Sequence, residues 1–383
     1  MPTTTEWFFL KDGRKSFKPN PLRDKAVMFC HQDVQENIQA AVEQAYALGT
    51  PIKLLLWGDW GVGKTHSLRH LEYWLSERSK DYPTRCVYVE IGDLDPKSSF
   101  ATVHKDLLEE IGLQTVIQWV HDYVRQGGAL VKDLEGIGVP ANIRETLNRM
   151  LMVAPGSTPP EMVSSAWQYL KGEELGPRAA AVGLTSPIVE SKDFYHILVA
   201  LGHLCEAVEK KKLLFMVDEA AKLEEAGLNA TMERHWVNVN KLIFDQDNTF
   251  FGFVYTVSGK NEKALPRAIY EPQIQNRLGP HRLLQLRTLQ PADVKKFLER
   301  LFDAFVDKDA VSRSTDATGS PGFDMKAYPF TGSARDEFVG FFERTQQDSK
   351  PRDITDRLDS AAFDAFRKQQ RLIDEDSLRR SGL

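Results

Sequence analysis

A glycine-rich loop directly after a short apolar run is the feature that most constrains the fold of this chain. Residues 58–65 read GDWGVGKT, and they follow the apolar sequence KLLLW. The fixed letters match G-x-x-x-x-G-K-[ST], a spacing at which backbone N–H groups surround a phosphate chain. Glycine suits such a loop because it takes positive φ angles without strain and lets the backbone approach oxyanions closely. The spacing predicts a nucleotide-phosphate site formed by Gly58, Asp59, Trp60, Gly61, Val62, Gly63, Lys64, Thr65 and His66.

The sequence on either side of the loop supports this interpretation. Residues 52–56 form a short buried-strand pattern, and residues 67–77 carry leucine at three- and four-residue steps, as in a helix. A strand, a glycine loop and a helix in this order are the expected context of a P-loop, and an ordinary glycine turn is the less favoured alternative. Lys64 is expected to reach the β- and γ-phosphates of ATP, and the Thr65 hydroxyl to bind Mg²⁺.

A second apolar run ends in two acids. Residues 213–219 read LLFMVDE, which is typical of a parallel strand buried on both faces. Such a strand delivers Asp218 to its carboxyl end, where parallel sheets bind ligands. We expect Asp218 to hold the hydrated Mg²⁺ beside Thr65, and Glu219 to orient the attacking water. A strand that simply precedes an acidic first helical turn is the alternative.

Composition limits the class of protein. The 383 residues allow two or three domains, and the net charge of −5 argues against a general coat of nucleic acid while leaving room for a local basic stripe. Cys30, Cys86 and Cys205 are scattered, so neither a disulfide framework nor a zinc site is indicated. No apolar run is long enough for a membrane helix, and the N-terminus lacks the layout of a signal peptide. We expect a cytoplasmic protein with no membrane partner.

Further patterns extend the P-loop into an α/β domain with a parallel sheet. Strands are predicted over 53–57, 85–94, 210–220 and 250–259, and helices over 33–47, 65–78 and 99–112. Residues 113–195 have helical stretches and no obvious strand, which predicts a helical insertion. A helical tail begins near 290, and its polar stretch 312–322 is predicted to be a mobile loop. The expected parts are an N-terminal segment (1–50), a P-loop ATPase domain (51–289) and a helical lid (290–383).

The order of these features resembles that of the AAA+ ATPases. It comprises a Walker A loop, a Walker B Asp-Glu pair, a strand with a polar end, and an arginine before a helical tail. The chain most resembles the branch that holds the origin-recognition and Cdc6-type initiators and the TnsC- and MuB-type transposition regulators, over roughly residues 20–375. A looser resemblance, on AWQYLKGEELGPRAAAVGL (166–184), is to ATP-binding proteins of BREX-type phage-defence systems.

The resemblance assigns roles on the strand 250–259 and on the segment after it. Ser258, or alternatively Thr256, stands where the family has its sensor 1 residue, which touches the γ-phosphate or the attacking water. Arg277, in PQIQNRLGPHRLLQL (272–286), matches the arginine finger that one subunit presents to the ATP of its neighbour. An exposed surface arginine is the alternative for Arg277.

The resemblance also assigns a role in the lid. Arg352, in SKPRDITDRLDSAAFDAF (349–366), matches the sensor 2 arginine that couples hydrolysis to lid movement. The segment departs from the family pattern, because Ser349, Lys350 and Pro351 stand where a glycine is usual.

Together these roles imply an ATPase that hydrolyses ATP with Mg²⁺ at the subunit interfaces of a homo-oligomer, as a ring or filament. The resemblance further implies assembly on double-stranded DNA and control of a partner enzyme such as a transposase or an antiviral defence effector. A STAND-like switch that acts on a protein partner without DNA is the main alternative, and a kinase of small substrates is a third. The apolar cluster 7–10 fits either an oligomer contact or a cover for the core.

Overall fold

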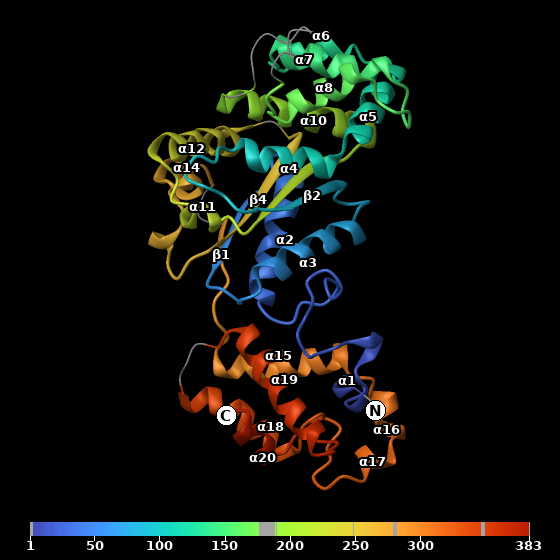
Figure 1. Ribbon diagram of the computed structural model, residues 1–383, viewed down its shortest axis with the longest axis vertical. Coiled ribbons are helices and arrows are strands. Elements are labelled where there is room, and N and C mark those ends of the chain that lie inside the picture. Colours follow the sequence, from blue (N-terminus) through green and yellow to red (C-terminus); the bar gives the residue numbers. More distant parts are fainter. Residues whose placement is uncertain are drawn as a thin grey trace. The chain divides into compact units, whose positions relative to one another are not determined.

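The chain folds into two compact units, as seen in a computed structural model (Figure 1). The structure describes residues 3–175, 188, 190–247, 249–278, 282–345 and 349–382. We name the sheet unit by its segments Glu36–Gly58 and Leu71–Gln285. The helical unit comprises Met1–Gln35, Asp59–His70 and Leu286–Leu383. Each unit has its own hydrophobic core.

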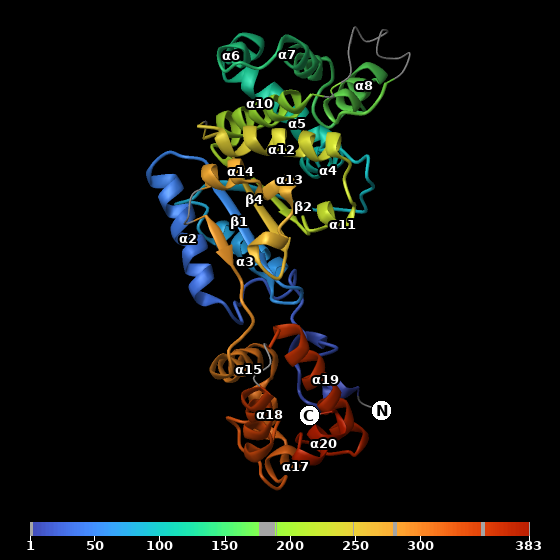
Figure 2. The same ribbon diagram turned by 90° about the vertical axis from the view of Figure 1, so that its left-hand side faces the viewer.

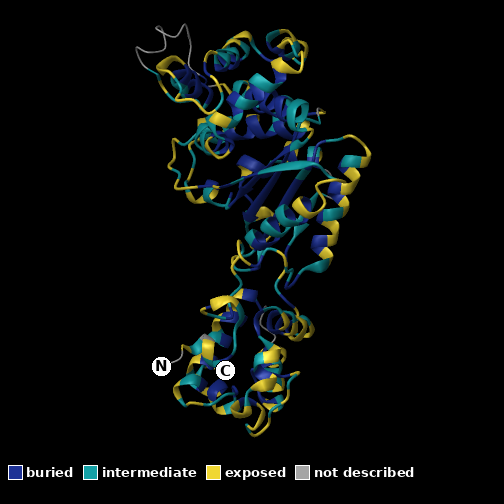
Figure 3. Ribbon diagram, turned by 90° about the vertical axis from the view of Figure 1, so that its right-hand side faces the viewer, coloured by how far each residue is buried: buried dark blue, intermediate teal, exposed yellow. Residues whose placement is uncertain are grey.

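The sheet unit is built on five parallel strands in the order β2-β3-β4-β1-β5 (Figures 1 and 2). The strands are β1 (Lys53–Gly58), β2 (Thr84–Glu90), β3 (Lys212–Asp218), β4 (Phe251–Ser258) and β5 (Leu283–Gln285). Successive residues of β1, β3 and β4 are buried although their side chains alternate between the two faces (Figure 3). Both faces of the central sheet are therefore covered, which explains why these strands read as continuous apolar runs.

The parallel register brings the carboxyl ends of four strands, β1, β2, β3 and β4, to one edge of the sheet. Gly58 of β1 pairs with Ser258 of β4, and Glu90 of β2 pairs with Asp218 of β3. Val217 pairs with Tyr255, which pairs with Leu55, so Asp218 is level with Leu56, two residues before Gly58. With about 4.8 Å between strands and about 3.3 Å per residue, Gly58 and Asp218 are separated by roughly 12 Å. This edge is where ligands of parallel sheets bind.

Helices pack against the sheet from several directions. Helix α10 packs on β3 and β4, α4 packs on β2, and α14 packs on β1. The helices of this part of the chain are α2 (Gln32–Ala47), α3 (Lys64–Glu77), α4 (Ala101–Ile111), α10 (Ser191–Glu209), α11 (Lys222–Glu225), α12 (Ala230–Asp245), α13 (Arg267–Tyr270) and α14 (Pro272–Leu278), with the short η3 (Glu262–Ala264). The first residues of α2 and α3 belong to the segments assigned to the helical unit.

Between α4 and α10, the regular elements among the described residues are all helices, joined by turns and loops. Its elements are α5 (Leu113–Arg125), α6 (Leu130–Gly136), α7 (Ala141–Asn148), η2 (Arg149–Met152) and α8 (Glu161–Leu170). They gather around α10 within the sheet unit (Figure 2). Trp119, Leu147 and Leu170 belong to the same continuous core as the strands. Residues 176–184 of the segment 166–184, for which the sequence predicted a BREX-type likeness, lie outside the described residues.

The helical unit joins the N-terminal segment to the C-terminal helices. Its elements are α1 (Thr4–Trp7), η1 (Lys11–Gly13), α15 (Pro291–Phe305), α16 (Lys308–Arg313), α17 (Thr315–Thr318), α18 (Gly332–Thr345), α19 (Pro351–Arg367) and α20 (Glu375–Arg380). Phe8 is fully buried in this core, Leu10 bridges to Val306, and the indole N–H of Trp7 donates to the Gln370 carbonyl at 2.7 Å. The apolar cluster 7–10 thus covers the core of its own chain.

Three sequence expectations differ from the structure. Strand β2 ends at Glu90 rather than at 94, since the following Gly-Asp-Leu-Asp segment offers no apolar face to continue it. Strand β5 was not predicted, because it has only three residues. The stretch 312–322 holds α17 and the end of α16, because Val311 and Ala317 are buried and give these turns an anchor.

Among the residues that the structure describes, none of the helices combines the length and the apolar character needed to cross a bilayer.

Candidate functional site

The glycine loop joins β1 to α3 through two glycines with left-handed backbone angles. The φ angle is +80° at Gly61 and +104° at Gly63, a region that L side chains rarely adopt. A Cβ atom at Gly61 would also lie 3.1 Å from the Cβ of Arg352, near the start of α19. Glycine at position 61 therefore serves two needs, the left-handed turn of the loop and the close approach of α19.

Positively charged side chains gather at this loop within the helical unit. Lys64, the first residue of α3, is only 9% exposed, and its ammonium donates to the Asp59 carbonyl at 2.9 Å. Lys350 forms an ion pair of 2.6 Å with the Asp59 carboxylate, and Arg352 packs on Gly61. The Trp60 ring remains 52% exposed. Cationic groups around a loop of inward-facing N–H groups suit a polyphosphate.

Three histidines tie the P-loop to the N-terminal segment. The Nε2 atom of His66 donates to the Val27 carbonyl at 2.7 Å, and Nδ1 of His70 donates to the Lys25 carbonyl at 2.7 Å. The third hydrogen bond runs from the N-terminal segment to the loop, because Nε2 of His31 donates to the Val62 carbonyl at 2.9 Å. Burial lowers the pKa of all three imidazoles below the ordinary value, which favours their neutral forms.

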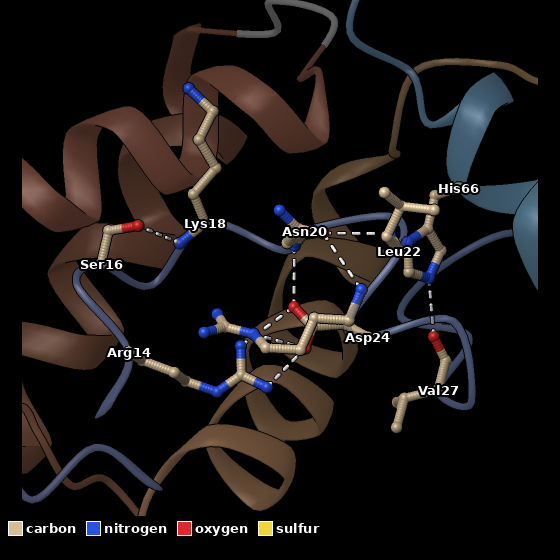
Figure 4. A network of polar contacts seen from close by, with 9 residues as sticks. Arg14, Ser16, Lys18, Asn20, Leu22, Asp24, Val27 and His66 are labelled. Atoms are coloured by element: carbon tan, nitrogen blue, oxygen red, sulfur yellow. Dashed lines mark hydrogen bonds and ion pairs between the residues drawn. The ribbon is translucent and has the colours of Figure 1, made fainter. Parts of the chain in front are cut away.

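The N-terminal segment is itself held by a buried carboxylate (Figure 4). Asp24 accepts two hydrogen bonds from the Arg14 guanidinium, at 2.5 and 2.9 Å, and one from the N–H of Asn20 at 2.7 Å. Burial alone would raise the pKa of Asp24, but the bonds from Arg14 and Asn20 outweigh it and hold that pKa below its usual range. The segment that contacts His66 is therefore a fixed support for the P-loop, and the sequence patterns did not reveal it.

The Asp-Glu pair occupies the carboxyl edge of the sheet unit. Asp218 is 1% exposed, and its carboxylate accepts hydrogen bonds from the Tyr88 hydroxyl at 2.8 Å and from the Thr256 hydroxyl. The N–H of Glu219 donates to Asp218 Oδ1 at 2.9 Å. Neither Tyr88 nor its contact with Asp218 was expected from the sequence.

Glu219 combines a left-handed backbone with a half-buried carboxylate. Its φ angle is +59°, an uncommon value for a residue other than glycine. Its Oε2 atom lies 3.6 Å from Nζ of Lys222, which also donates to the Ile91 carbonyl at 2.7 Å. The side chain of Glu219 is thereby placed beside the ends of β2 and β3, at the edge that carries Asp218.

The two hydroxyl residues predicted for β4 lie in different surroundings. Thr256 is fully buried and its hydroxyl donates to Asp218. Ser258 is the last residue of β4, is half-buried, and pairs with Gly58 at the root of the glycine loop.

Arg277 lies at the other edge of the sheet unit. Its Nε forms an ion pair of 2.9 Å with Asp245, the last residue of α12, and its side chain is 32% exposed. Lys53, at the amino end of β1, donates to the Phe244 and Gln246 carbonyls on either side of Asp245. Five residue steps of β1, on the order of 16 Å, separate Lys53 from Gly58. Arg277 is therefore not brought together with Asp218.

The residues present fit a hard divalent cation. The carboxylate of Asp218 in the sheet unit and the hydroxyl of Thr65 in the helical unit are each of a kind that Mg²⁺ prefers as a ligand. Over the described ranges, no group of three or more His, Cys, Asp or Glu side chains is arranged to hold a metal ion. A cation here would take its remaining ligands from water and phosphate oxygens, which is usual for Mg²⁺ beside a nucleotide.

Comparison with solved structures identifies the fold. The ORC2 protein of Aeropyrum pernix, in its ADPNP–ADP complexes, matches this chain with a TM-score of 0.56 at 13% sequence identity, over 97% of this chain and 71% of its own. The ADP form of the same protein matches with a TM-score of 0.53 at 13% sequence identity. The match covers 97% of this chain and 72% of the ORC2 chain. No protein-family model matches the sequence, and a search of curated proteins finds no relative. The chain has the AAA+ P-loop fold of the ORC/Cdc6 type, and the predicted fold class is confirmed.

Proposed function

We propose that this chain is an ATPase that binds and hydrolyses ATP with Mg²⁺ at the interfaces of a homo-oligomer. The observation that carries the proposal is that Gly58, Ser258 and Asp218 each end one of the neighbouring strands β1, β4 and β3, at the carboxyl edge of the sheet. Gly58 continues directly into the glycine loop, so the phosphate-binding segment starts from the edge that holds the acidic pair.

Within this proposal each residue at the P-loop edge has a distinct task. Lys64 binds the β- and γ-phosphates. Thr65 and Asp218 would hold Mg²⁺, which would neutralise charge on the phosphates. Glu219 orients the attacking water and accepts its proton. Ser258 contacts the γ-phosphate from the end of β4, and Arg352 does so from the lid helix that packs on Gly61.

The arginine finger is the part of the proposal that requires a second chain. Arg277 lies on the edge of the sheet away from Asp218, so it acts on the nucleotide of a neighbouring subunit. An arginine finger typically contributes about 10³–10⁵ in rate, which corresponds to about 4–7 kcal/mol of barrier. The ion pair with Asp245 would have to open or shift when the guanidinium meets the neighbour's phosphates.

The wider role proposed is assembly on double-stranded DNA to recruit or regulate a partner enzyme of transposition or antiviral defence. This part rests on the order of motifs in the sequence, which resembles that of initiators and transposition regulators. A STAND-type switch that acts on a protein partner would use the same motifs as a DNA-assembled ATPase. One measurement distinguishes the two candidate functions.

That measurement is steady-state ATP hydrolysis with and without duplex DNA, with the Lys64→Ala variant as the blank. We expect wild-type turnover to rise with DNA and the rise to fade with added salt, because phosphate contacts release counterions. Turnover that does not respond to DNA would reject the DNA role and favour the switch. Wild-type turnover no greater than that of the blank would reject the ATPase itself.

A further inference from the structure

The carboxylate of Asp218 is held from both neighbouring strands. Tyr88 stands two residues before the end of β2, diagonal to Asp218, and donates its phenolic proton to Oδ2 at 2.8 Å. Thr256 lies on β4 beside the end of β3 and donates its hydroxyl proton to Oδ1. The backbone N–H of Glu219 adds a third donor, to Oδ1, at 2.9 Å.

These three hydrogen bonds fix the orientation of the buried Asp218 carboxylate. A carboxylate that is 1% exposed has lost nearly all of its water, so unpaired oxygens would cost several kcal/mol. A carboxylate has about four acceptor sites, and the three donors occupy three of them. Hydroxyl donors to a carboxylate are among the stronger hydrogen bonds of proteins. The direction of the remaining acceptor site is therefore fixed by Tyr88 and Thr256.

We infer that Tyr88 and Thr256 are positioning residues that aim Asp218 at the divalent cation of the nucleotide. The inference rests on the proposed function. It also separates the two hydroxyls of β4, because the Thr256 proton is engaged with Asp218 while Ser258 stands at the strand end. Contact with the γ-phosphate accordingly belongs to Ser258, and Thr256 acts through Asp218.

The test is the affinity for Mn²⁺, counted by electron paramagnetic resonance, in the presence of a non-hydrolysable ATP analogue. We expect Tyr88→Phe and Thr256→Val each to weaken Mn²⁺ binding by about 10- to 100-fold, as is usual when a group that orients a metal ligand is lost. Binding of the analogue without metal should stay within about twofold of wild type, because neither side chain is placed at the phosphates. Thr256→Ser keeps the hydroxyl and should bind Mn²⁺ as wild type does.

Matched controls separate positioning from stability. Tyr46 makes similar hydroxyl bonds at the amino end of β2, to the Pro83 carbonyl and the Thr84 hydroxyl, both at 2.8 Å. Buried Thr146 donates to the Asn142 carbonyl inside α7. Tyr46→Phe and Thr146→Val should therefore lower thermal stability without changing the affinity for Mn²⁺.

The outcomes distinguish this inference from the proposed function. If wild type with the analogue holds no Mn²⁺, the proposed function fails. If wild type binds Mn²⁺ and the folded Tyr88→Phe and Thr256→Val variants bind it equally well, only the positioning role is overturned. The same holds if the control variants lose as much affinity as these two.

Discussion

At the scale of single residues, the backbone of Glu219 carries strain at the candidate site. A left-handed conformation costs an L-residue about 1–2 kcal/mol. Such strain persists only where surrounding contacts determine it, and here the Glu219 N–H bonds to Asp218 and to the Thr256 hydroxyl. The strained angle therefore places the carboxylate that we assign to the attacking water.

This strain predicts the order of stability of two variants that both lack the carboxylate. Glu219→Gly should be more stable than Glu219→Ala by about 1 kcal/mol, because glycine takes the left-handed angle without the Cβ penalty. Urea unfolding measures the difference. An alanine variant that is as stable as the glycine variant would show that position 219 is not held in this conformation.

A buried histidine predicts a pH dependence of stability. His104 is fully buried, its Nε2 donates to the Leu170 carbonyl at 2.9 Å, and burial lowers its pKa to about 4 from 6.5. As the pH falls, this imidazole is therefore protonated in the unfolded chain at a higher pH than in the folded chain. The free energy of unfolding decreases as pH falls from 6.5 towards 4. Between about pH 7.5 and pH 5 this histidine alone should cost about 2 kcal/mol.

The matched variant is His104→Gln, whose amide can donate to the same carbonyl but does not titrate. Its free energy of unfolding should fall by about 2 kcal/mol less than that of wild type over the same pH interval. Equal losses in the two proteins would contradict the depressed pKa of His104.

At the scale of elements, the sequence predicts a helix, strand or loop correctly where its apolar or glycine pattern matches the burial or backbone angles that the element has in the fold. The apolar runs of β1, β3 and β4, the glycine loop and α3 were all placed within a few residues. The sequence does not predict β5, since its three residues become a strand only by pairing with Leu55, Leu56 and Trp57 of β1.

The candidate site was predictable in part for the same reason. The loop and the Asp-Glu pair have fixed local spacing. The supports of these groups do not, because Tyr88 and Lys350 reach them from segments distant in sequence. The carbonyls of Lys25 and Val27 contact the P-loop helix through backbone atoms, which leave no mark in the side-chain pattern.

The packing of α19 on the glycine loop predicts the cost of a single methyl group. Gly61→Ala must adopt a left-handed angle and also press on the Cβ of Arg352, whereas Gly49→Ala meets a similar φ of +62° with nothing within 4 Å. Gly61→Ala should therefore lose about 1 kcal/mol more stability than Gly49→Ala, as is typical of overpacking. Chemical unfolding of both variants measures this excess.

A double-mutant cycle tests whether the additional stability loss of Gly61→Ala comes from the contact between residue 61 and Arg352. In an Arg352→Gly background the Cβ partner is gone, so Gly61→Ala should cost no more than Gly49→Ala. An excess that persists in this background would mean that the contact between the loop and α19 does not produce it.

At the scale of the whole molecule, the proposed function assigns two complementary parts of one reaction to separate edges of the sheet unit. Asp218 and Glu219 lie at the carboxyl edge, and Arg277 lies near the amino end of β1. A chain that offers a site at one edge and a finger at another associates head to tail. Such interfaces close into rings or continue as filaments, in agreement with the oligomer proposed.

The most direct test of the central claim, a catalytic site shared between subunits, is a mixing experiment with two inactive variants. Glu219→Gln keeps the finger and lacks the base, whereas Arg277→Ala keeps the base and lacks the finger. Each alone should turn over ATP at least about 10²-fold more slowly than wild type. In a mixed oligomer, the Arg277→Ala subunit receives a finger from its Glu219→Gln neighbour, so hydrolysis should recover well above the sum of the two separate rates. A mixture of folded variants that stays at that sum, under conditions where wild type is active, would contradict the account.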